Sequence, residues 1–320
     1  MQLPIALRRA VEQELATCST PALRAASAGL SQLYRAENPS APPLSSDEQR
    51  AAYLAVRLPA TYAAVVEALR WTRESCSEEV SSVLDLGSGP GTALWAASEV
   101  FPELASCTGF ERDARFLEIA RRIGQQAEHA ALRTAQWTQG DLSTGLPAGK
   151  WDLVICSYAL NELREATRAE VIRRAWAVTG KLFVIIEPGT KVGFANVLAA
   201  RGLLLAQGAA LAAPCPHALA CPMAQSGDWC HFAARVERTA EHRRLKDASL
   251  GHEDEKFSYV AFSRSAVQAP QTRIVRHPRI FSGYTQLTLC TAGKIVNKTV
   301  TRSKKEDWRR LKRLSWGDGW

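Results

Sequence analysis

The stretch VLDLGSGPGTA, residues 83–93, decides the fold. It begins with a short apolar run typical of a buried strand, and the residues that follow its last glycine, TALWAASEVF, favour a helix. Gly87, Gly89 and Gly91 stand between the two, where the lack of a Cβ lets the backbone turn sharply and approach a ligand. Because a helix N-terminus carries unpaired N–H groups, the stretch predicts a nucleotide-binding loop.

Strand-like and helical stretches alternate through the middle of the chain. The expected strands after residue 87 are SCTGFERD, RTAQWTQGDL, WDLVICSYAL and KLFVIIEPGT. Such alternation predicts an α/β fold with a parallel, doubly wound sheet. Downstream, KFSYVAFSRS, TRIVRH, TQLTLCTAG and KIVNKTVTR are expected to be strands joined by turns, and an antiparallel pair from this region is expected to close the same sheet. A parallel sheet closed in this way is the arrangement of the class I methyltransferases.

The remaining segments differ in composition. The N-terminal region is rich in Ala, Leu, Glu and Arg with apolar residues three and four apart, which predicts helices. Ser46 followed by Gln49 predicts a capping box at the start of one of them. The expected organisation is a helical region (1–75), a methyltransferase-like core (76–210 and 256–301), a cysteine-rich insertion (211–255) and a basic C-terminal tail (302–320).

Two classes of ligand fit the glycine loop. Dinucleotide folds use G-x-G-x-x-G, but here the third glycine comes one residue early. The pattern D-x-G-x-G-x-G instead resembles the first motif of S-adenosylmethionine enzymes. That resemblance implies that Asp85, or the backbone near it, faces the methionine end and that Asp141 meets the adenine amino group. Glu111 ends the next strand, where a carboxylate accepts the ribose hydroxyls in either class.

The catalytic end of this fold is less informative. The expected strand that ends near residue 157 runs into CSYALNELRE, so Ser157, Tyr158, Asn161 and Glu162 are candidates to line the pocket. For each of these residues, a structural role at the start of the next helix is an equal alternative. The Asn-Pro-Pro-aromatic and Pro-Cys motifs of some nucleic-acid methyltransferases are absent from the sequence. No catalytic base is therefore assigned.

Three cysteines lie close together in the sequence, with the spacing C-x5-C-x8-C, and a fourth lies far downstream. They are Cys215, Cys221, Cys230 and Cys290. In a reducing compartment such a set predicts metal binding rather than disulfides. Structural zinc sites usually space paired ligands two to four residues apart, whereas sets of four thiolates also bind iron–sulfur clusters. An iron–sulfur cluster is therefore favoured over zinc, with a metal-free set as the third reading, and His217 and His231 are alternative ligands.

The charge distribution suggests a polyanionic partner. The chain has a formal net charge of +8, and residues 302–313 hold seven basic side chains against Glu306 and Asp307. This local excess is typical of phosphate-backbone binding, and a solvated helix is the alternative. The sequence shows neither a leader peptide nor a transmembrane run. We therefore expect a bacterial-type cytoplasmic protein that is free of membranes and monomeric when alone.

Several motifs together resemble a known family. APCPHALACP (213–222), DWCHF (228–232), EDEKFSYVAF (253–262) and WRRLKRLSWGD (308–318) are similar to the small-ribosomal-subunit methyltransferase-like family, which includes mitochondrial ribosome assembly factors and bacterial relatives. The resemblance implies a class I methyltransferase core and association with the small ribosomal subunit or its rRNA. It also implies a [4Fe–4S] cluster bound by Cys215, Cys221, Cys230 and Cys290.

Two functions follow as hypotheses. The first is an rRNA methyltransferase that uses S-adenosylmethionine. The second is a non-catalytic assembly factor that binds RNA and retains a vestigial methyltransferase site. A radical S-adenosylmethionine enzyme is disfavoured, because four candidate ligands leave no iron open and the cofactor loop is separate.

Overall fold

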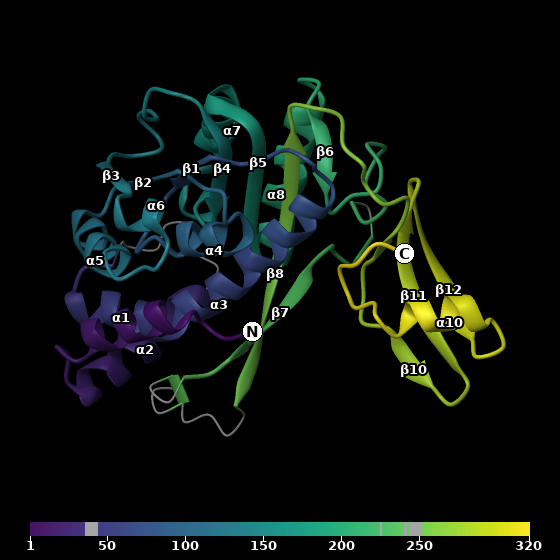
Figure 1. The fold of residues 1–320 in the computed structure, drawn as a ribbon, viewed down its shortest axis with the longest axis horizontal. Coiled ribbons are helices and arrows are strands. Elements are labelled where there is room, and N and C mark those ends of the chain that lie inside the picture. The colour runs from purple at the N-terminus through teal and green to yellow at the C-terminus, as the bar shows by residue number, and fades with distance from the viewer. Residues whose placement is uncertain (36–43, 225, 240–241, 244–250) are drawn as a thin grey trace.

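A computed structural model describes residues 1–35, 44–224, 226–239, 242–243 and 251–320 (Figure 1). The helices are α1 (Ile5–Leu15), α2 (Thr20–Arg35), α3 (Asp47–Glu74), α4 (Thr92–Val100), α5 (Ala114–Gly124), α6 (Ala130–Arg133), the 3-10 helix η1 (Leu160–Glu162), α7 (Glu165–Val178), α8 (Lys191–Leu205) and α10 (Lys305–Leu311). The strands are β1 (Ser82–Leu86), β2 (Ser106–Glu111), β3 (Gln136–Gln139), β4 (Trp151–Ser157), β5 (Thr179–Pro188), β6 (Ala210–Ala213), β7 (Phe232–Glu237), β8 (His252–Ser263), β9 (Arg273–Ile274), β10 (Arg279–Phe281), β11 (Tyr284–Thr291) and β12 (Lys294–Thr301).

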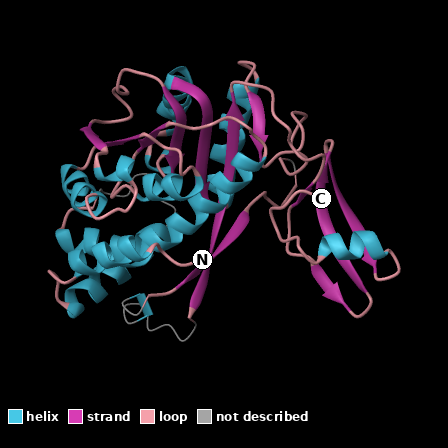
Figure 2. Cartoon of the chain, in the orientation of Figure 1, coloured by secondary structure: helices cyan, strands magenta, loops and turns pink. Residues whose placement is uncertain are grey.

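The larger sheet has the order β3-β2-β1-β4-β5-β8-β6, and β7 also pairs with β8. Strands β1 to β5 are parallel, while β8 runs antiparallel to β5. The predicted doubly wound sheet with an antiparallel edge is confirmed, and with it the methyltransferase-type fold. Figure 2 shows its strands in magenta between layers of helices.

Alternate residues of these strands enter two separate hydrophobic cores. Val83 and its equivalents pack against α3 and α4, whereas Leu84 and its equivalents pack against α7 and α8. Burial on both faces explains why the strands read as continuous apolar runs rather than as alternating ones.

Helix α3 crosses one face of the larger sheet. It begins at the predicted capping box: the Ser46 hydroxyl accepts from the Gln49 N–H at 3.2 Å, and the Gln49 side chain accepts from the Ser46 N–H at 3.4 Å. By length and composition α3 could cross a membrane, but 83% of its apolar window is buried inside the fold. That burial is expected of a central core helix, which passes the same test.

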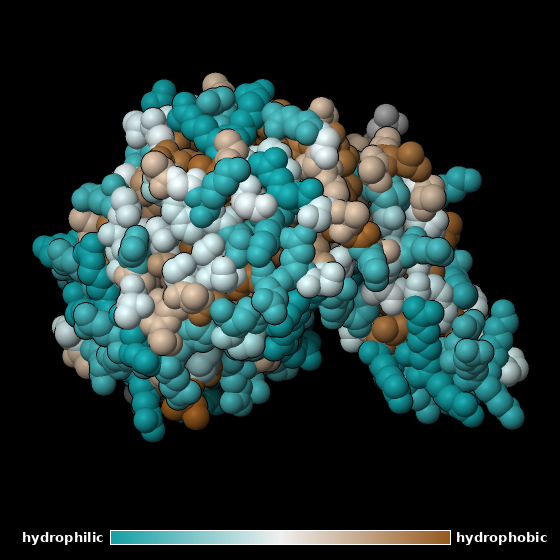
Figure 3. Space-filling model, turned by 45° about the horizontal axis from the view of Figure 1, so that its top comes forward, coloured by the Kyte–Doolittle hydropathy of each residue, from teal (hydrophilic) through white to brown (hydrophobic). Residues whose placement is uncertain are grey.

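Residues 273–301 form a second sheet, with the order β10-β11-β12 and β9 paired to β11. The prediction that these strands close the methyltransferase sheet is wrong; only β8 does so. The physical reason is that the outer edge of β8 is already taken, by β6 at one end and β7 at the other. The second sheet lies beside the larger one (Figure 1), and the space-filling view shows a notch between the two lobes that these sheets form (Figure 3).

The basic C-terminal segment is folded onto the second sheet rather than extended as a tail. Leu311 of α10 joins the small hydrophobic core of that sheet, and Trp316 is also buried. The chain end then returns to the larger lobe, where the Trp71 indole N–H donates to Asp318 at 3.2 Å.

The cysteine-rich segment connects β6 to β7, so it leaves and rejoins the same edge of the larger sheet. The sequence placed it directly after the last crossover helix and missed β6. Residues 225, 240–241 and 244–250 of the expected 211–255 insertion lie outside the described residues.

Candidate functional site

The glycine loop lies between β1 and α4, at the point where the strand order reverses between β1 and β4. Ligands of open α/β sheets bind in the crevice at such a switch point. Gly87 has φ +71°, and a Cβ there would lie 2.7 Å from the Ala159 Cβ. Gly91 has φ +84°, and a Cβ there would lie 2.5 Å from the Trp137 ring. Both positions therefore require glycine for conformation and for space.

Glu111 is tied to the loop. Its carboxylate accepts from the Gly89 N–H at 2.8 Å and from the Asp113 N–H at 2.9 Å. Glu111 is 9% exposed, so these hydrogen bonds are made in a nearly dry setting. The structure thus brings together the loop and the carboxylate that the sequence assigned to ribose.

Asp85 is buried beside them without a partner. It is 1% exposed, and neither carboxylate oxygen has a hydrogen-bond partner among the described residues. Burial, together with the negative charge of Glu111, raises the pKa of Asp85 to about 8. A charged, unpaired carboxylate is costly in such a place, so this position suits a protonated acid or a positively charged ligand.

Asp141 lies after β3 and organises its own turn. One carboxylate oxygen accepts from the Ser143 N–H at 2.7 Å and from the Ser143 hydroxyl at 2.6 Å. These hydrogen bonds lower the pKa of Asp141. The position agrees with the expected adenine contact, but the turn is a structural role that the residue already performs.

The four pocket candidates after β4 separate in the structure. Tyr158 has φ +57°, a strained conformation for a residue with a side chain. Its hydroxyl donates to Glu255 at 3.1 Å, and Glu255 also pairs with Arg57 at 3.1 Å. Glu162 pairs with Arg112 at 3.1 Å, and burial raises the pKa of its carboxyl although the arginine opposes this. Ser157 ends β4 and Asn161 lies in η1.

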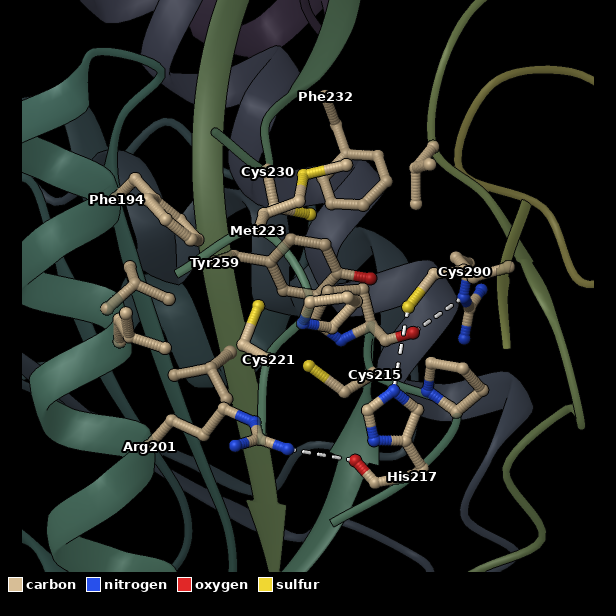
Figure 4. A pocket seen from close by; sticks show the side chains of 18 of the residues that line it. Phe194, Arg201, Cys215, His217, Cys221, Met223, Cys230, Phe232, Tyr259 and Cys290 are labelled. Atoms are coloured by element: carbon tan, nitrogen blue, oxygen red, sulfur yellow. Dashed lines mark hydrogen bonds between the residues drawn. The ribbon is translucent and has the colours of Figure 1, made fainter. Parts of the chain in front are cut away.

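The four cysteines line a single cavity. Cys215 and Cys221 come from the loop after β6, Cys230 precedes β7, and Cys290 comes from β11 of the second sheet. Figure 4 shows their sulfur atoms directed toward this space, which Phe232 and Tyr259 also border. The fold therefore brings one residue of the second sheet to three of the connecting segment.

Two arginines border the same cavity. Arg201 donates to the His217 carbonyl at 3.0 Å and to the Leu219 carbonyl at 2.7 Å, which fixes the loop between the first two cysteines. Arg273 donates to the Pro214 carbonyl at 2.9 Å and to the Gly317 carbonyl at 2.8 Å. Arg201 Nε and Arg273 Nη2 are buried without a hydrogen-bond partner in the described part of the chain. Two such cationic donors suit an anionic group in the cavity.

The geometry is not that of a preformed single-ion site. Over the described residues, no three side chains of His, Cys, Asp or Glu type form a group that could hold one metal ion. Burial, with the neighbouring Cys215 and Cys221, raises the pKa of Cys290 to about 12. His217 Nε2 lies 3.7 Å from the Cys290 sulfur, whereas His231 stacks on Trp229 outside the cavity lining.

The sequence did not single out either arginine as part of this site. Arg201 interrupts the apolar run of α8, and a lone charge in such a run is a signal that could have marked it. Arg273 gives no local signal, because its partners Pro214 and Gly317 are distant in sequence.

Comparison with known proteins identifies relatives. A family model described as mitochondrial small ribosomal subunit Rsm22 matches residues 47–320. The human mitochondrial ribosome assembly protein METTL17 is 28% identical over 294 residues, which cover 83% of this chain and 61% of that protein. The mitochondrial Rsm22-cox11 tandem protein 2 of Schizosaccharomyces pombe is 26% identical over 332 residues, which cover 85% of this chain and 43% of that protein. The chain thus spans less than two thirds of either relative.

Solved structures with a similar fold include methyltransferases. Magnesium protoporphyrin IX methyltransferase ChlM from Synechocystis has a TM-score of 0.43 and 13% identity, covering 73% of this chain and 93% of that one. The plantazolicin methyltransferase BpumL has a TM-score of 0.42 and 11% identity, covering 81% and 99%.

The expected bacterial-type cytoplasmic location is wrong on these comparisons. The matching family and both relatives are mitochondrial by name.

Proposed function

This chain belongs to the Rsm22 family of the mitochondrial small ribosomal subunit, and from that premise we propose that it acts on or with small-subunit rRNA during ribosome assembly. The family match over residues 47–320 is the observation that carries the proposal. The name of the human relative, a ribosome assembly protein, supports it. The basic segment 302–313 supplies a surface suited to RNA phosphates.

We further propose that the glycine loop binds S-adenosylmethionine. In this proposal Glu111 accepts from the ribose hydroxyls, Asp85 faces the cationic methionine end and Asp141 lies at the adenine. The buried and unpartnered carboxylate of Asp85 supports this, because a positive charge nearby would stabilise its ionised form.

Calorimetric titration with S-adenosylmethionine tests the cofactor site. Glu111→Ala removes a charged acceptor of two hydroxyls, so affinity should fall by about ten- to a hundredfold. Glu118→Ala is the matched control, since Glu118 is an exposed carboxylate on α5 paired with Arg115. Equal affinity of the Glu111 variant and the wild type would contradict the proposal.

The cysteine cavity is proposed to hold a [4Fe–4S] cluster. Four thiols and two buried arginines with unpaired N–H groups fit an anionic cluster. A tetrahedral zinc site holds its thiolate sulfurs about 3.8 Å apart, given Zn–S distances of about 2.3 Å. The described cysteines form no group of that kind, so the proposal of a cluster rests on the four thiols and the two arginines around them. Such a centre would join the second sheet to the segment between β6 and β7.

Metal analysis of anaerobically purified protein tests this centre. We expect iron and sulfide in equal amounts in the wild type and a loss of both in Cys290→Ala. Cys76→Ala is the control, because Cys76 lies outside the cavity lining and should leave the iron content unchanged. Stoichiometric zinc without iron would overturn the assignment.

The proposal has two forms, an rRNA methyltransferase and a non-catalytic assembly factor, which differ in whether methyl transfer takes place. Among the candidates after β4, Glu162 is engaged with Arg112, and the Tyr158 hydroxyl donates to Glu255. This favours an assembly factor that binds the cofactor over an enzyme that needs proton abstraction. Transfer of labelled methyl groups to small-subunit rRNA by the wild type, and its absence in Glu111→Ala, would decide for the enzyme.

A further inference from the structure

One face of the second sheet packs against α10, while the other lines the cysteine cavity at one end, through Cys290 and Ile295, and is exposed at its outer end. Leu287, Leu289 and Val300 share the covered face, where Leu311 of α10 and Trp308 pack on them. Because side chains alternate along a strand, the intervening residues lie on the opposite face. The strand register places there the pairs Phe281 with Tyr284 and Arg279 with Gln286, and Thr299 lies beside Gln286. We call these five residues the open face.

The open face carries a stacked aromatic pair at its outer end. The rings of Phe281 and Tyr284 lie 4.7 Å apart at an interplanar angle of 11°. Phe281 is 42% exposed, so part of this stack is accessible to solvent. A flat, rigid ring surface of this kind is suited to a planar partner, because stacking gains energy without ordering a flexible side chain.

Arg279 supplies positive charge beside the pair. From Lys256 to Lys305 the chain contains no aspartate or glutamate, and Arg279 is exposed on the open face, whereas Arg276 and Lys298 are paired with Asp228 and Asp307. The rest of the open face is uncharged and able to form hydrogen bonds, through Gln286 and Thr299. Basic and polar groups around exposed rings fit a polyanion with planar groups, and they do not fit an acyl chain, which has neither charge nor a planar face.

We propose that the open face binds unpaired nucleotides of RNA. A base stacks on the Phe281–Tyr284 pair, and the Arg279 guanidinium contacts a neighbouring phosphate. Single-stranded segments are the class recognised, since the bases of a duplex are already stacked on each other and their faces are inaccessible. This inference rests on the proposed association with rRNA and deepens it, by naming the part of the RNA that is read and the residues that read it.

The test compares Phe281→Ala with a neighbour on the other face. Ile280 pairs with Thr285 on the covered side of the register and is 80% exposed, so Ile280→Ala removes a more exposed apolar group next to the same position. Fluorescence anisotropy is measured with a labelled single-stranded RNA oligonucleotide and with the corresponding duplex. Base–aromatic stacking predicts that Phe281→Ala weakens single-strand binding about tenfold or more. Ile280→Ala and the conservative Phe281→Trp should bind like the wild type.

The remaining outcomes separate this inference from the proposed function. Arg279→Gln should reduce the salt dependence of single-strand binding by about one phosphate contact. If Phe281→Ala binds single strands as tightly as the wild type while the protein still associates with small-subunit precursors, the inference is wrong and the proposed function stands. If Phe281→Ala keeps normal RNA affinity but no longer associates with the precursors, the open face binds a protein and the inference is wrong. If the wild type binds anionic vesicles through Phe281, the open face binds lipid and the inference is also wrong. Wild-type protein that binds neither RNA nor precursors contradicts both.

Discussion

At the scale of single residues, two carboxylates at the glycine loop influence each other's charge. Asp85 lies buried with no partner, and Glu111 beside it is held by backbone N–H groups. The two differ because Glu111 ends its strand within reach of the loop, whereas Asp85 lies inside its strand. The folded protein therefore keeps a proton on Asp85 that the unfolded chain releases.

This proton makes stability depend on pH. The pKa of Asp85 is raised to about 8 by burial and by Glu111, so between about pH 4 and 8 the native state binds a proton that the unfolded state does not. The contribution of Asp85 to the free energy of unfolding then falls as pH rises, by at most about 1.4 kcal/mol per pH unit. Asp85→Asn should remove that slope. Urea unfolding of both proteins from pH 5 to 8 measures it, and parallel curves would contradict the assignment.

Sequence reasoning was strongest where chemistry is local to a few residues. The cysteine spacing identified side chains that the fold brings to one cavity, and the glycine loop was identified with its strand and helix. The lone charge of Arg201 in an apolar helix was not taken as a signal, and Arg273 was not singled out because its partners Pro214 and Gly317 are far away in the chain. Local pattern carries no information about such partners.

At the scale of elements, β11 and β12 were predicted as strands but assigned to the wrong sheet, and the edge of the larger sheet explains why. The runs that became β8, β11 and β12 all have strand composition, and each was predicted as a strand. Composition does not say which edge a strand joins. Because β6 and β7 pair with the outer edge of β8, the later strands form a sheet of their own. Cys290 therefore approaches the other three cysteines from a different sheet.

Helix α10 presents exposed basic residues from the second sheet. Arg309, Lys312 and Arg313 are exposed and lie in or next to this helix. Replacing all three by glutamine should weaken RNA binding at low salt and lower the slope of log affinity against log salt by about two to three. Filter binding across a salt series checks this. The control replaces three arginines on helices of the larger lobe, Arg8, Arg173 and Arg174. An equal loss of RNA affinity in the control would mean that binding follows only net charge.

At the scale of the whole molecule, the cysteine cavity lies where the two sheets meet. Arg273 bonds from β9 to Pro214, and Arg276 bonds to the Trp229 carbonyl at 3.1 Å, so the second sheet is attached to the cysteine segment on both sides. The C-terminal Asp318 adds a contact to α3. The position of the open face and of α10 relative to the methyltransferase fold therefore depends on this junction.

Electron cryo-microscopy of the anaerobically prepared protein bound to small-subunit precursors tests the central claim most directly. We predict that the second sheet contacts rRNA through α10 and the open face, with strong density between Cys215, Cys221, Cys230 and Cys290. A complex in which the second sheet faces solvent, or a preparation in which the protein does not associate with the precursors, would contradict it.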